Sequence, residues 1–417
     1  MAGSAHLPGA RPSTGPIEGS FEKIQHGSRA FLKTQVALAI AGFSTFALLY
    51  SIQPLLPVFS LVFHKTEASA SLALSVTSGV MAFCMLVASS ISESIGRKPV
   101  MVASVVSSSL LMALSALVPE WWQFLALRAL MGVTLSGLPA VAMAYVAEEI
   151  HPRSTGLSIG LYIGGNAFGG MVGRLVIGVL TTHIGWRDAV LVIGLVSLIG
   201  NLTFWRLLPP SRFFQPRRFS PAALGSAFIA HLRDGALLML YAEGFLLMGS
   251  FIVIYNYLGY RLLAPPFNLS QTIVGLIFSC YLIGIFSSAW MGNLGNKLGR
   301  RRVLWVGFAI MLAGTALTET HSVILIIAGV ALVTFGFFGS HSIASSWVGM
   351  RARHARAQAS SLYLFFYYLS ASVVGTTGGV FMQHWGWNGV VFLTCLLLLT
   401  GLFLSWRLSR MQPLPTV

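Results

Sequence analysis

The sequence predicts an all-α integral membrane protein whose twelve transmembrane helices form two six-helix halves. Its 417 residues are 55% hydrophobic and 9% charged, a composition that no soluble globular domain with a hydrated surface shows. Apolar stretches long enough to cross about 30 Å of hydrocarbon at about 1.5 Å per residue recur along the whole chain. Short motifs of the first half return in the second half at a nearly constant spacing, which indicates an internal repeat.

The predicted spans come in two sets of six. The first set covers residues 34–63, 69–92, 99–118, 121–147, 157–181 and 189–207, and the second covers 235–260, 270–294, 303–318, 322–349, 357–382 and 387–406. Around them we expect a disordered cytoplasmic leader over 1–32, an N-terminal half over 33–208, a cytoplasmic linker over 209–234, a C-terminal half over 235–408 and a cytoplasmic tail over 409–417. The leader is rich in Gly, Pro and Ser and has no apolar core of a cleavable signal, while the linker is rich in Pro and Arg.

The net charge of +15 raises the question of a nucleic-acid partner, which the distribution of the basic residues answers. If the N-terminus is cytoplasmic, 21 of the 26 Lys and Arg residues fall in cytoplasmic segments. Lys65, Arg187 and Arg261 fall outside, and Arg128 and Arg174 lie within spans. The positive-inside rule therefore predicts that both termini are cytoplasmic and accounts for the charge without any nucleic acid.

The internal repeat is clearest in two loops. The end of the second span reads Ser89-x-x-x-Glu93-Ser94-Ile95-Gly96-Arg97-Lys98, and the end of the eighth reads Gly292-x-x-x-Asn296-Lys297-Leu298-Gly299-Arg300-Arg301. Ser89 and Gly292 stand 203 residues apart, as do His151 and His354, and His183 and His384 stand 201 apart. Two parallel halves joined by a basic loop predict a substrate site between them, near the midplane, that opens alternately to each side.

These loop motifs resemble the G-x-x-x-D-R-x-G-R-R signature of the major facilitator superfamily, and the similarity covers residues 33–410. Arg128-x-x-x-Gly132 in span four resembles the second motif of that superfamily, which is associated with proton coupling. In span five, Gly165-Asn166-x-x-Gly169-Gly170 resembles the antiporter motif G-P-x-x-G-G, and its glycines let neighbouring backbones approach closely. Among subfamilies the chain most resembles the bacterial arabinose-efflux-like and drug:proton antiporters of twelve spans. The resemblance implies the major facilitator fold and the bacterial inner membrane.

The resemblance also implies a cytoplasmic gate formed by the two loops, namely Glu93, Gly96, Arg97, Lys98, Asn296, Gly299, Arg300 and Arg301. Glu93 ends span two, where its carboxylate can face the positive N-terminal end of span eleven or nearby arginines. Alternatively, Arg97 and Lys98 serve topology alone. The chain departs from the family pattern because Ser89 replaces a glycine, Ser94 an arginine, Asn296 the second carboxylate and Asn166 the proline. We therefore expect a weaker charged gate than the family pattern provides.

Glu243 is the one acidic residue of eleven that lies within a predicted span. A carboxyl group whose neutral form is favoured by burial can take up a proton on one side of the membrane and release it on the other. Alternatively, Glu243 reaches the cytoplasmic interface or forms a structural pair. We predict that Glu243 carries the proton and that Arg128, through the motif it resembles, takes part in the coupling.

Five further residues are candidates for the substrate cavity: Arg174, Tyr50, Gln53, Asn256 and His341. An arginine at the centre of a span costs roughly 2.5 to 3.5 kcal/mol on insertion scales, which indicates a polar partner or cavity. For Arg174, binding of a substrate anion and snorkelling to the interface are both open, and for the other four helix packing through hydrogen bonds is the alternative. Two arginines against one glutamate predict a net positive cavity for anionic or neutral solutes.

We therefore predict a secondary active transporter that exports a small organic solute in exchange for protons. A proton symporter or facilitator for uptake is the alternative on the same fold, and a non-transporting receptor or scaffold is disfavoured by the short loops. An enzyme is not expected, because no nucleophile, base and orienting group cluster in the sequence, and neither a cofactor nor a metal motif occurs. The expected partners are the solute, protons and the lipid bilayer, with no obligate protein partner evident.

Overall fold

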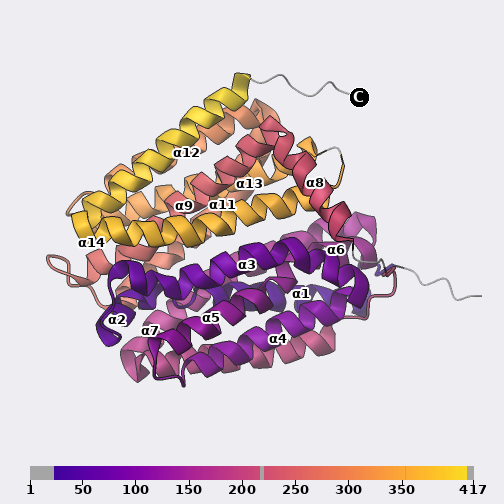
Figure 1. Ribbon diagram of the computed structural model, residues 1–417, viewed down its shortest axis with the longest axis horizontal. Helices are drawn as coiled ribbons and strands as arrows, with labels where there is room; N and C mark the ends of the chain where they lie inside the picture. Colours follow the sequence, from indigo (N-terminus) through magenta and orange to yellow (C-terminus); the bar gives the residue numbers. More distant parts are fainter. Residues whose placement is uncertain (1–22, 217–219, 353, 411–417) are drawn as a thin grey trace, which may run out of the picture.

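The computed structural model describes residues 23–216, 220–352 and 354–410, which form two groups of long helices (Figure 1). The first group consists of α1 (Arg29–Tyr50), the 3-10 turn η1 (Gln53–Leu55), α2 (Leu56–Val62), α3 (Glu67–Ile95), α4 (Arg97–Ser115), α5 (Trp121–Leu135), α6 (Gly137–Glu149) and α7 (Pro152–Leu207). The second group consists of α9 (Gly235–Leu263), α10 (Gln271–Ile277), the 3-10 turn η2 (Phe278–Cys280), α11 (Tyr281–Leu298), α12 (Arg300–Leu317), α13 (Val323–Arg351) and α14 (Arg356–Arg410). Between the groups lies α8 (Pro221–Arg233).

These elements account for the twelve predicted spans. Within the described ranges, nine helical segments are long and apolar enough to cross a membrane. Two of them, α7 with 56 residues and α14 with 55, are about twice the length needed and bend at Gly185 and Gly386, so each supplies two spans. The twelfth span is α12, whose 18 residues begin with three consecutive arginines. The fold is thus an all-α integral membrane fold with twelve spans in two halves.

The repeat that the sequence predicts is also visible in the backbone. Gly96 and Gly299 both have a positive φ, of 113° and 89°, and each joins two antiparallel helices in a tight turn. Gly185 and Gly386 likewise have φ values of 79° and 59° at the bends of α7 and α14. A residue with a Cβ atom rarely adopts these angles, so glycine is required at the equivalent turns of both halves.

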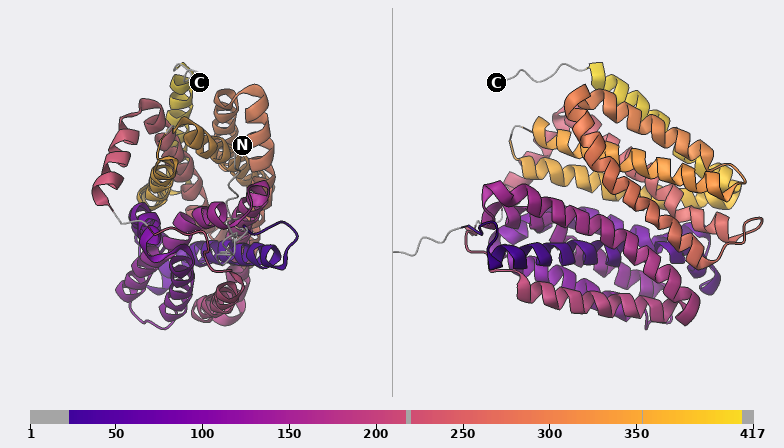
Figure 2. Two further views of the ribbon diagram at one scale, coloured as in Figure 1. Left: turned by 90° about the vertical axis from the view of Figure 1, so that its right-hand side faces the viewer. Right: turned by 180° about the vertical axis from the view of Figure 1, so that it is seen from behind.

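Each group is held together by close helix packing, and the two groups meet along two seams. Inside the groups, α1 packs on α7 and α9 packs on α14. Between the groups, α3 packs on the first part of α14, and α10 packs on α7. Figure 2 shows both groups from behind and from the end of the molecule that holds α6 and α8. We call this the terminal end, and the opposite end, which holds α2 and the bends of α7 and α14, the far end.

The two groups are closed against each other at the far end. Hydrogen bonds across this contact join Ser60 to Tyr260 at 2.7 Å, Tyr260 to the Leu56 carbonyl at 2.8 Å and Thr182 to Thr272 at 3.2 Å. The backbones of α7 and α10 also touch there, because a Cβ atom on Gly178 would lie 3.2 Å from the Cα atom of Gly275.

The same face of α7 is free at the terminal end. Gly160 precedes Gly178 by five helical turns and therefore points in the same direction, toward the second group. A Cβ atom built on Gly160 meets no atom within 4 Å, and Gly156 and Gly164 are equally unobstructed. The structure is therefore closed at the far end and open at the terminal end.

Three boundaries differ from the sequence-based expectation. The leader was expected to be disordered through residue 32, and residues 1–22 lie outside the described ranges, but the Ile24 amide donates to the Glu149 carbonyl and α1 begins at Arg29. Hydrogen bonds of Ile24 with Glu149 and His151 hold this segment against the end of α6. The linker contains a helix, α8, and α14 continues to Arg410, past the expected start of the tail.

Candidate functional site

A chain of three buried polar side chains crosses from the first group to the second. The Arg174 Nε donates to the Gln53 Oε1 at 2.6 Å, and the Gln53 Nε2 donates to the Asn256 Oδ1 at 2.6 Å. All three side chains are buried. Gln53 and Asn256 stand 203 residues apart, which is the spacing of the repeated loop motifs. The chain therefore links equivalent positions of the two halves, and it continues the far-end contact toward the middle of the molecule.

Arg174 lies inside a box of aromatic rings. Its guanidinium carbon is 4.4 Å from the ring centre of Tyr50, 4.7 Å from that of Tyr281 and 5.2 Å from that of Phe278. The side chain is 1% exposed, and within the described part of the chain no carboxylate pairs with it. Cation–π contacts of this kind contribute about 0.5 to 2 kcal/mol each. The aromatic rings and Gln53 thus stabilise a positive charge that has no ionic partner among the described residues.

Two polar atoms beside this chain are buried and unpaired among the described residues. They are the Tyr50 hydroxyl and the Asn256 Nδ2. A buried donor without a partner costs about 1 to 3 kcal/mol, so an acceptor supplied from outside the protein would be stabilised here. Arg174, Tyr50, Gln53 and Asn256 were all predicted from the sequence as cavity residues, and the structure brings them together.

Arg128 binds the end of a broken helix. Its Nη1 and Nη2 donate to the carbonyl oxygens of Leu48 and Leu49 at 3.3 and 3.1 Å, and its Nε donates to the Ala73 carbonyl at 2.8 Å. These carbonyls of α1 lie just before η1, where Pro54 interrupts the regular helix. The guanidinium therefore caps the C-terminal end of α1 and holds the bend that presents Gln53.

Glu243 is fully buried inside the second group. Its Oε1 accepts a hydrogen bond from the Ser405 Oγ at 2.8 Å, and its Oε2 has no partner among the described residues. No Lys or Arg forms an ion pair with it in the described part of the chain. The next residue, Gly244, packs against the ring of Tyr363. Glu243 and Arg128 lie in different groups, so the structure does not bring the two predicted coupling residues together.

His341 connects to the same cluster. Its Nδ1 lies 2.9 Å from the Tyr363 hydroxyl, and its ring stacks on Phe337 at a centroid distance of 5.9 Å and an angle of 10°. The ring of Tyr367 lies 4.9 Å away. His341 is half-buried, and its contact with Tyr363 connects it to the ring that packs against Gly244, the residue after Glu243.

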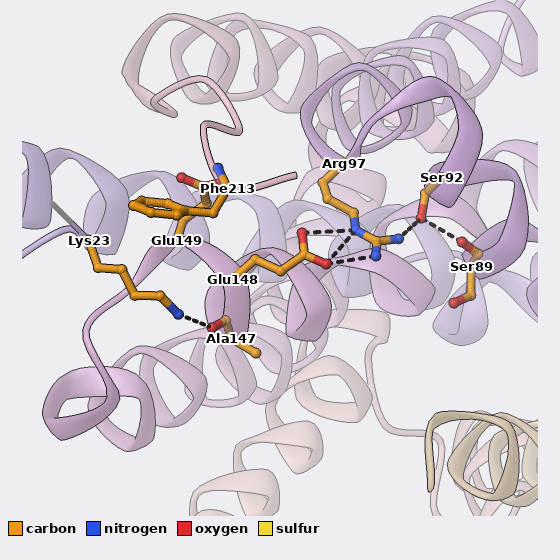
Figure 3. A network of polar contacts seen from close by, with 8 residues as sticks. All are labelled: Lys23, Ser89, Ser92, Arg97, Ala147, Glu148, Glu149 and Phe213. Carbon is orange, nitrogen blue, oxygen red and sulfur yellow. Dashed lines mark hydrogen bonds and ion pairs between the residues drawn. The ribbon is translucent and has the colours of Figure 1, made fainter. Parts of the chain in front are cut away.

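The loop between α3 and α4 is held within the first group (Figure 3). The Arg97 Nη2 lies 2.7 Å from the Glu148 Oε1, the Arg97 Nε donates to both carboxylate oxygens at 3.2 Å, and the Nη1 donates to the Ser92 Oγ at 2.5 Å. Lys98 binds the Leu208 carbonyl. Glu93 lines a small polar pocket beside Arg97 and Glu148, and among the described residues it forms no ion pair. The expected contact of Glu93 with the start of α14 is absent from the described contacts in this conformation.

The equivalent loop of the second group carries a different arrangement. Gly299 makes the same turn as Gly96, but the side chain of Asn296 lies outside the described part of the structure. Arg300 begins α12, and Arg301 lines a groove between α12 and the end of α14. Arg351, which stands 203 residues after Glu148, pairs with Asp234 at 3.2 Å. The two loops are therefore similar in backbone and different in charge.

The glycine motif of span five lies at the contact between α7 and α1. A Cβ atom on Gly165 would lie 2.7 Å from the Ala39 carbonyl, and one on Gly169 would lie 2.0 Å from the Phe43 carbonyl. Gly170 lies beside Arg174 and Phe46, and the Asn166 side chain lies near Gly42. The motif thus packs two helices of the same group rather than the two groups against each other.

Sequence reasoning missed several residues of these clusters. Tyr281 and Phe278 complete the box around Arg174, Tyr363 links His341 to the neighbourhood of Glu243, and Ser405 binds Glu243. Aromatic and small polar residues are common in apolar spans, so no local signal distinguishes these four.

Comparison with known proteins assigns the fold to a family. The model of the Major Facilitator Superfamily matches residues 38–266 and 244–416. The chain is 46% identical over 392 residues to the uncharacterized MFS-type transporter YybF of Bacillus subtilis (strain 168), covering 94% of this chain and 97% of that protein. It is also 46% identical over 387 residues to the inner membrane transport protein YnfM of Escherichia coli (strain K12), covering 93% of each.

Solved structures share the fold at low sequence identity. A bacterial homolog to the human lysosomal transporter Spinster, in an inward-facing and unoccupied conformation, matches with a TM-score of 0.73 and 14% identity, over 92% of this chain and 97% of that one. The nucleoside transporter NupG matches with a TM-score of 0.76 and 14% identity, over 90% of this chain and 100% of that one. At this identity, the similarity describes the arrangement of the helices.

Proposed function

The chain belongs to the major facilitator superfamily and is a multi-pass membrane transporter, and from this premise we propose that it exports a small organic solute in exchange for protons. One observation carries the proposal of proton coupling. Glu243 lies in the second group with one carboxylate oxygen bound to Ser405, the other unpaired, and no basic partner among the described residues. Burying an unpaired carboxylate costs several kcal/mol, so the neutral acid is the form that suits this site, and ionisation requires a change of conformation or of solvation.

The proposed orientation follows from the basic residues. We infer that the terminal end is cytoplasmic, since the loops at that end carry most of the Lys and Arg residues. With this orientation, the far-end closure through Ser60 and Tyr260 and the free face around Gly160 describe an inward-open conformation. The host membrane is proposed to be a bacterial inner membrane, in line with the name of the YnfM relative.

The proposed solute is anionic or neutral. Arg174 offers a buried positive charge at the inner limit of the far-end contact, and the rings of Tyr50 and Tyr281 beside it provide apolar surface. The Asn256 Nδ2 adds an unused donor. A carboxylate or carbonyl group that accepts hydrogen bonds from Arg174 and Asn256 would fit this chemistry, and an adjacent aromatic or aliphatic part would pack on the tyrosines.

The proposed cycle alternates between two conformations of the two halves, 33–208 and 235–408. In the outward-open state Glu243 takes up a proton. Closure of the far end, through contacts such as Gln53 with Asn256, then gives the conformation described above, which holds Glu243 as the neutral acid. Hydration of the Glu243 site from the terminal end then lets the carboxyl release its proton, and the solute enters from the cytoplasm. In the return step the loops around Glu93 and Arg300 would close the terminal end. Arg128 would act as a positioning residue that holds the bend before Gln53.

The proton gradient is sufficient for this work. Each charge that moves across 100 mV supplies about 2.3 kcal/mol, which supports a solute gradient of roughly 50-fold for an exchange of one proton. The proposal therefore needs no nucleotide hydrolysis.

The test uses everted membrane vesicles with an acidic interior, in which solutes of each charge class are added and the pH gradient is followed. We expect one class, anionic or neutral, to collapse the gradient in the wild type and to have no effect in Glu243→Gln. A matched control is Glu319→Gln, which removes a carboxylate from the far-end loop and should behave as the wild type.

Three other outcomes decide against the exchange. If labelled solute crosses the membrane while the gradient is unaffected in both proteins, the chain is a facilitator. If solute accumulates in right-side-out vesicles together with protons, it is a symporter for uptake. Absence of any flux over a broad panel would instead favour a receptor or scaffold.

A further inference from the structure

A groove on the outer wall of the second group leads to the hydrogen-bond partner of Glu243. The groove lies at the terminal end between the start of α12 and the end of α14 and has a volume of about 300 Å³. Its lining residues are Arg301, Arg302, Trp305, Val306, Ser405 and Trp406. Trp305, Val306 and Trp406 are exposed on the lipid-facing surface, whereas Ser405 is buried and forms the inner wall. The Ser405 hydroxyl that borders the groove is the one that donates to Glu243.

The first group contains an equivalent groove in which an apolar residue stands at the position of Ser405. That groove is lined by Lys98, Pro99, Val102, Ala103, Leu202 and Trp205, together with neighbouring residues. Lys98, Pro99, Val102 and Ala103 each stand 203 residues before Arg301, Arg302, Trp305 and Val306, and Leu202 stands 203 before Ser405. The residue equivalent to Glu243 is Ile40, which lies near Gly200 of α7, just as Glu243 lies against the end of α14.

The two groups differ at these equivalent positions in both polarity and burial. In the first group Ile40 is half-buried and Leu202 is 37% exposed, and both side chains are apolar. In the second group Glu243 and Ser405 are both buried, and burying a carboxyl and a hydroxyl has a free-energy cost that apolar side chains avoid. The buried pair of Glu243 and Ser405 therefore has no counterpart at the equivalent positions of the first group.

The opposite side of Glu243 faces the interior of the second group. There the ring of Tyr363 of α14 packs against Gly244, the residue after Glu243, and its hydroxyl lies 2.9 Å from the Nδ1 of the half-buried His341 of α13. Tyr241 lies two residues before Glu243 on α9, and its hydroxyl is unpaired among the described residues, while Arg301 and Arg302 line the groove that Ser405 also lines. The carboxyl thus lies between the groove and the Tyr363–His341 pair, and it is separated from the chain of Arg174, Gln53 and Asn256.

We propose that Glu243 exchanges its proton with the terminal-end aqueous phase through the groove between α12 and α14, by way of Ser405, so that proton and solute reach the transporter by different routes. This rests on the proposed role of Glu243 as proton carrier. In the release step the Ser405 hydroxyl passes its hydrogen to a water molecule in the groove and takes the hydrogen of the Glu243 carboxyl, which becomes a carboxylate. Arg301 and Arg302 at the mouth favour the resulting negative charge and draw water into the groove.

The first test is chemical and independent of transport. An apolar carbodiimide enters from the lipid phase and adds to a protonated carboxyl, giving a stable adduct whose mass identifies Glu243 in the intact protein. We expect Glu243 to be labelled in the wild type and labelling to fall at least fivefold in Val306→Trp, which fills the groove at an exposed position. Ala103→Trp, the equivalent change in the first group, is the control and should label as the wild type does.

The second test measures coupling. Ser405→Leu installs the residue of the first group and should lower proton-driven transport at least tenfold, while exchange of labelled for unlabelled solute continues, because this exchange moves no net protons. Val306→Trp provides the same comparison if Ser405→Leu does not fold. Leu202→Ser, the converse change at the equivalent position of the first group, is the control for both variants.

The outcomes separate this inference from the proposed function. If Glu243→Gln abolishes coupling but Val306→Trp leaves both labelling and coupling unchanged, Glu243 is the proton carrier and the groove is not its route. If solute protects Glu243 from the carbodiimide in the wild type, the carboxyl communicates with the solute site, and separate routes are wrong. If Glu243→Gln itself retains full coupling, the proposed function fails first.

Discussion

The Arg128 Nη2 donates to the carbonyl oxygen of Leu49 at 3.1 Å, and this contact fixes the place where α1 breaks before Gln53. Together with the bonds to Leu48 and Ala73 it gives the guanidinium three carbonyl partners inside an apolar bundle. A charged donor placed at the end of a helix is stabilised by the partial negative charge there. Arg128 therefore acts on the chain of Arg174, Gln53 and Asn256 through the backbone, without touching it.

Replacing Arg128 with Met tests this role. Three buried carbonyls would lose a charged donor, so we expect the free energy of unfolding in detergent to fall by about 3 kcal/mol. Arg128→Lys keeps the charge but cannot donate to several carbonyls at once as a guanidinium does. Its free energy of unfolding should therefore lie between those of the wild type and Arg128→Met. A Met variant of unchanged stability that has lost only proton coupling would show that Arg128 acts in coupling itself.

The contact between Gly178 and Gly275 tests the far-end closure. A tryptophan at position 178 cannot fit against α10, so it should shift the population toward the opposite conformation. The measurement is labelling of Gly160→Cys by an impermeant maleimide in a background without the native residues Cys84, Cys280 and Cys395. We expect labelling to drop at least threefold with Gly178→Trp and to stay unchanged with Val179→Trp, which changes an exposed neighbour. Equal labelling in both variants would mean that the far-end contact does not control the terminal end.

Two glycines of α7 should respond in opposite ways to the same substitution. In Gly169→Ala the new methyl group would lie 2.0 Å from the Phe43 carbonyl, so α1 and α7 must separate, and we expect a loss of about 2 kcal/mol in unfolding free energy. In Gly160→Ala the methyl group meets nothing, and the gain in helix propensity should stabilise the protein by up to about 1 kcal/mol. Thermal unfolding of both variants beside the wild type gives the comparison. A similar change in unfolding free energy in both variants would mean that helix propensity alone determines the effect.

The contacts of Asp234 predict how the stability of the protein depends on pH. Burial by itself would raise the pKa of Asp234, but hydrogen bonds from Arg351 and from the Leu237 and Ala236 amides hold the pKa below its ordinary value. The stabilisation is therefore complete above the ordinary pKa of an aspartate, about 3.9, and is lost as the pH falls through the lower, folded-state value. We expect the wild type to lose stability below about pH 4 more steeply than Asp234→Asn. Parallel profiles of the two proteins would assign the acid sensitivity to other groups.

Most of the fold could be predicted from the sequence because lipid imposes simple rules on a membrane-spanning chain. The apolar stretches located the spans, because backbone hydrogen bonds in lipid must be satisfied within each helix. Gly96 and Gly299 marked the equivalent turns of the two halves. The helix α8 was not predicted, because its segment lies among prolines and arginines that read as an irregular linker. The predicted leader extends too far, to residue 32, because the pairing of Ile24 with Glu149 joins residues far apart in the sequence.

The candidate site was predictable only in part. Polar side chains in apolar spans are rare, so Gln53, Asn256, Arg174 and Glu243 stood out from their neighbours. Their partners did not, because a serine such as Ser405 is common in membrane helices and acquires its role only through the helix it faces. Arg128 stood out through its motif, but its contacts could not be predicted, since its three oxygen partners are backbone carbonyls.

The bond between Gln53 and Asn256 has a consequence for how the two halves came to fit each other. When two like units pack around a two-fold axis, the residue that lies on the axis must meet its own counterpart. An amide suits this place because it carries both a donor and an acceptor and is therefore complementary to itself, whereas two carboxylates or two ammonium groups would repel. In the present chain one of the two bonds of such a pair is formed, from the Gln53 Nε2 to the Asn256 Oδ1. The Gln53 Oε1 accepts from Arg174 instead, and the Asn256 Nδ2 is unpaired among the described residues, so the divergence of the halves has turned one side of a symmetric join into a contact for a charged side chain.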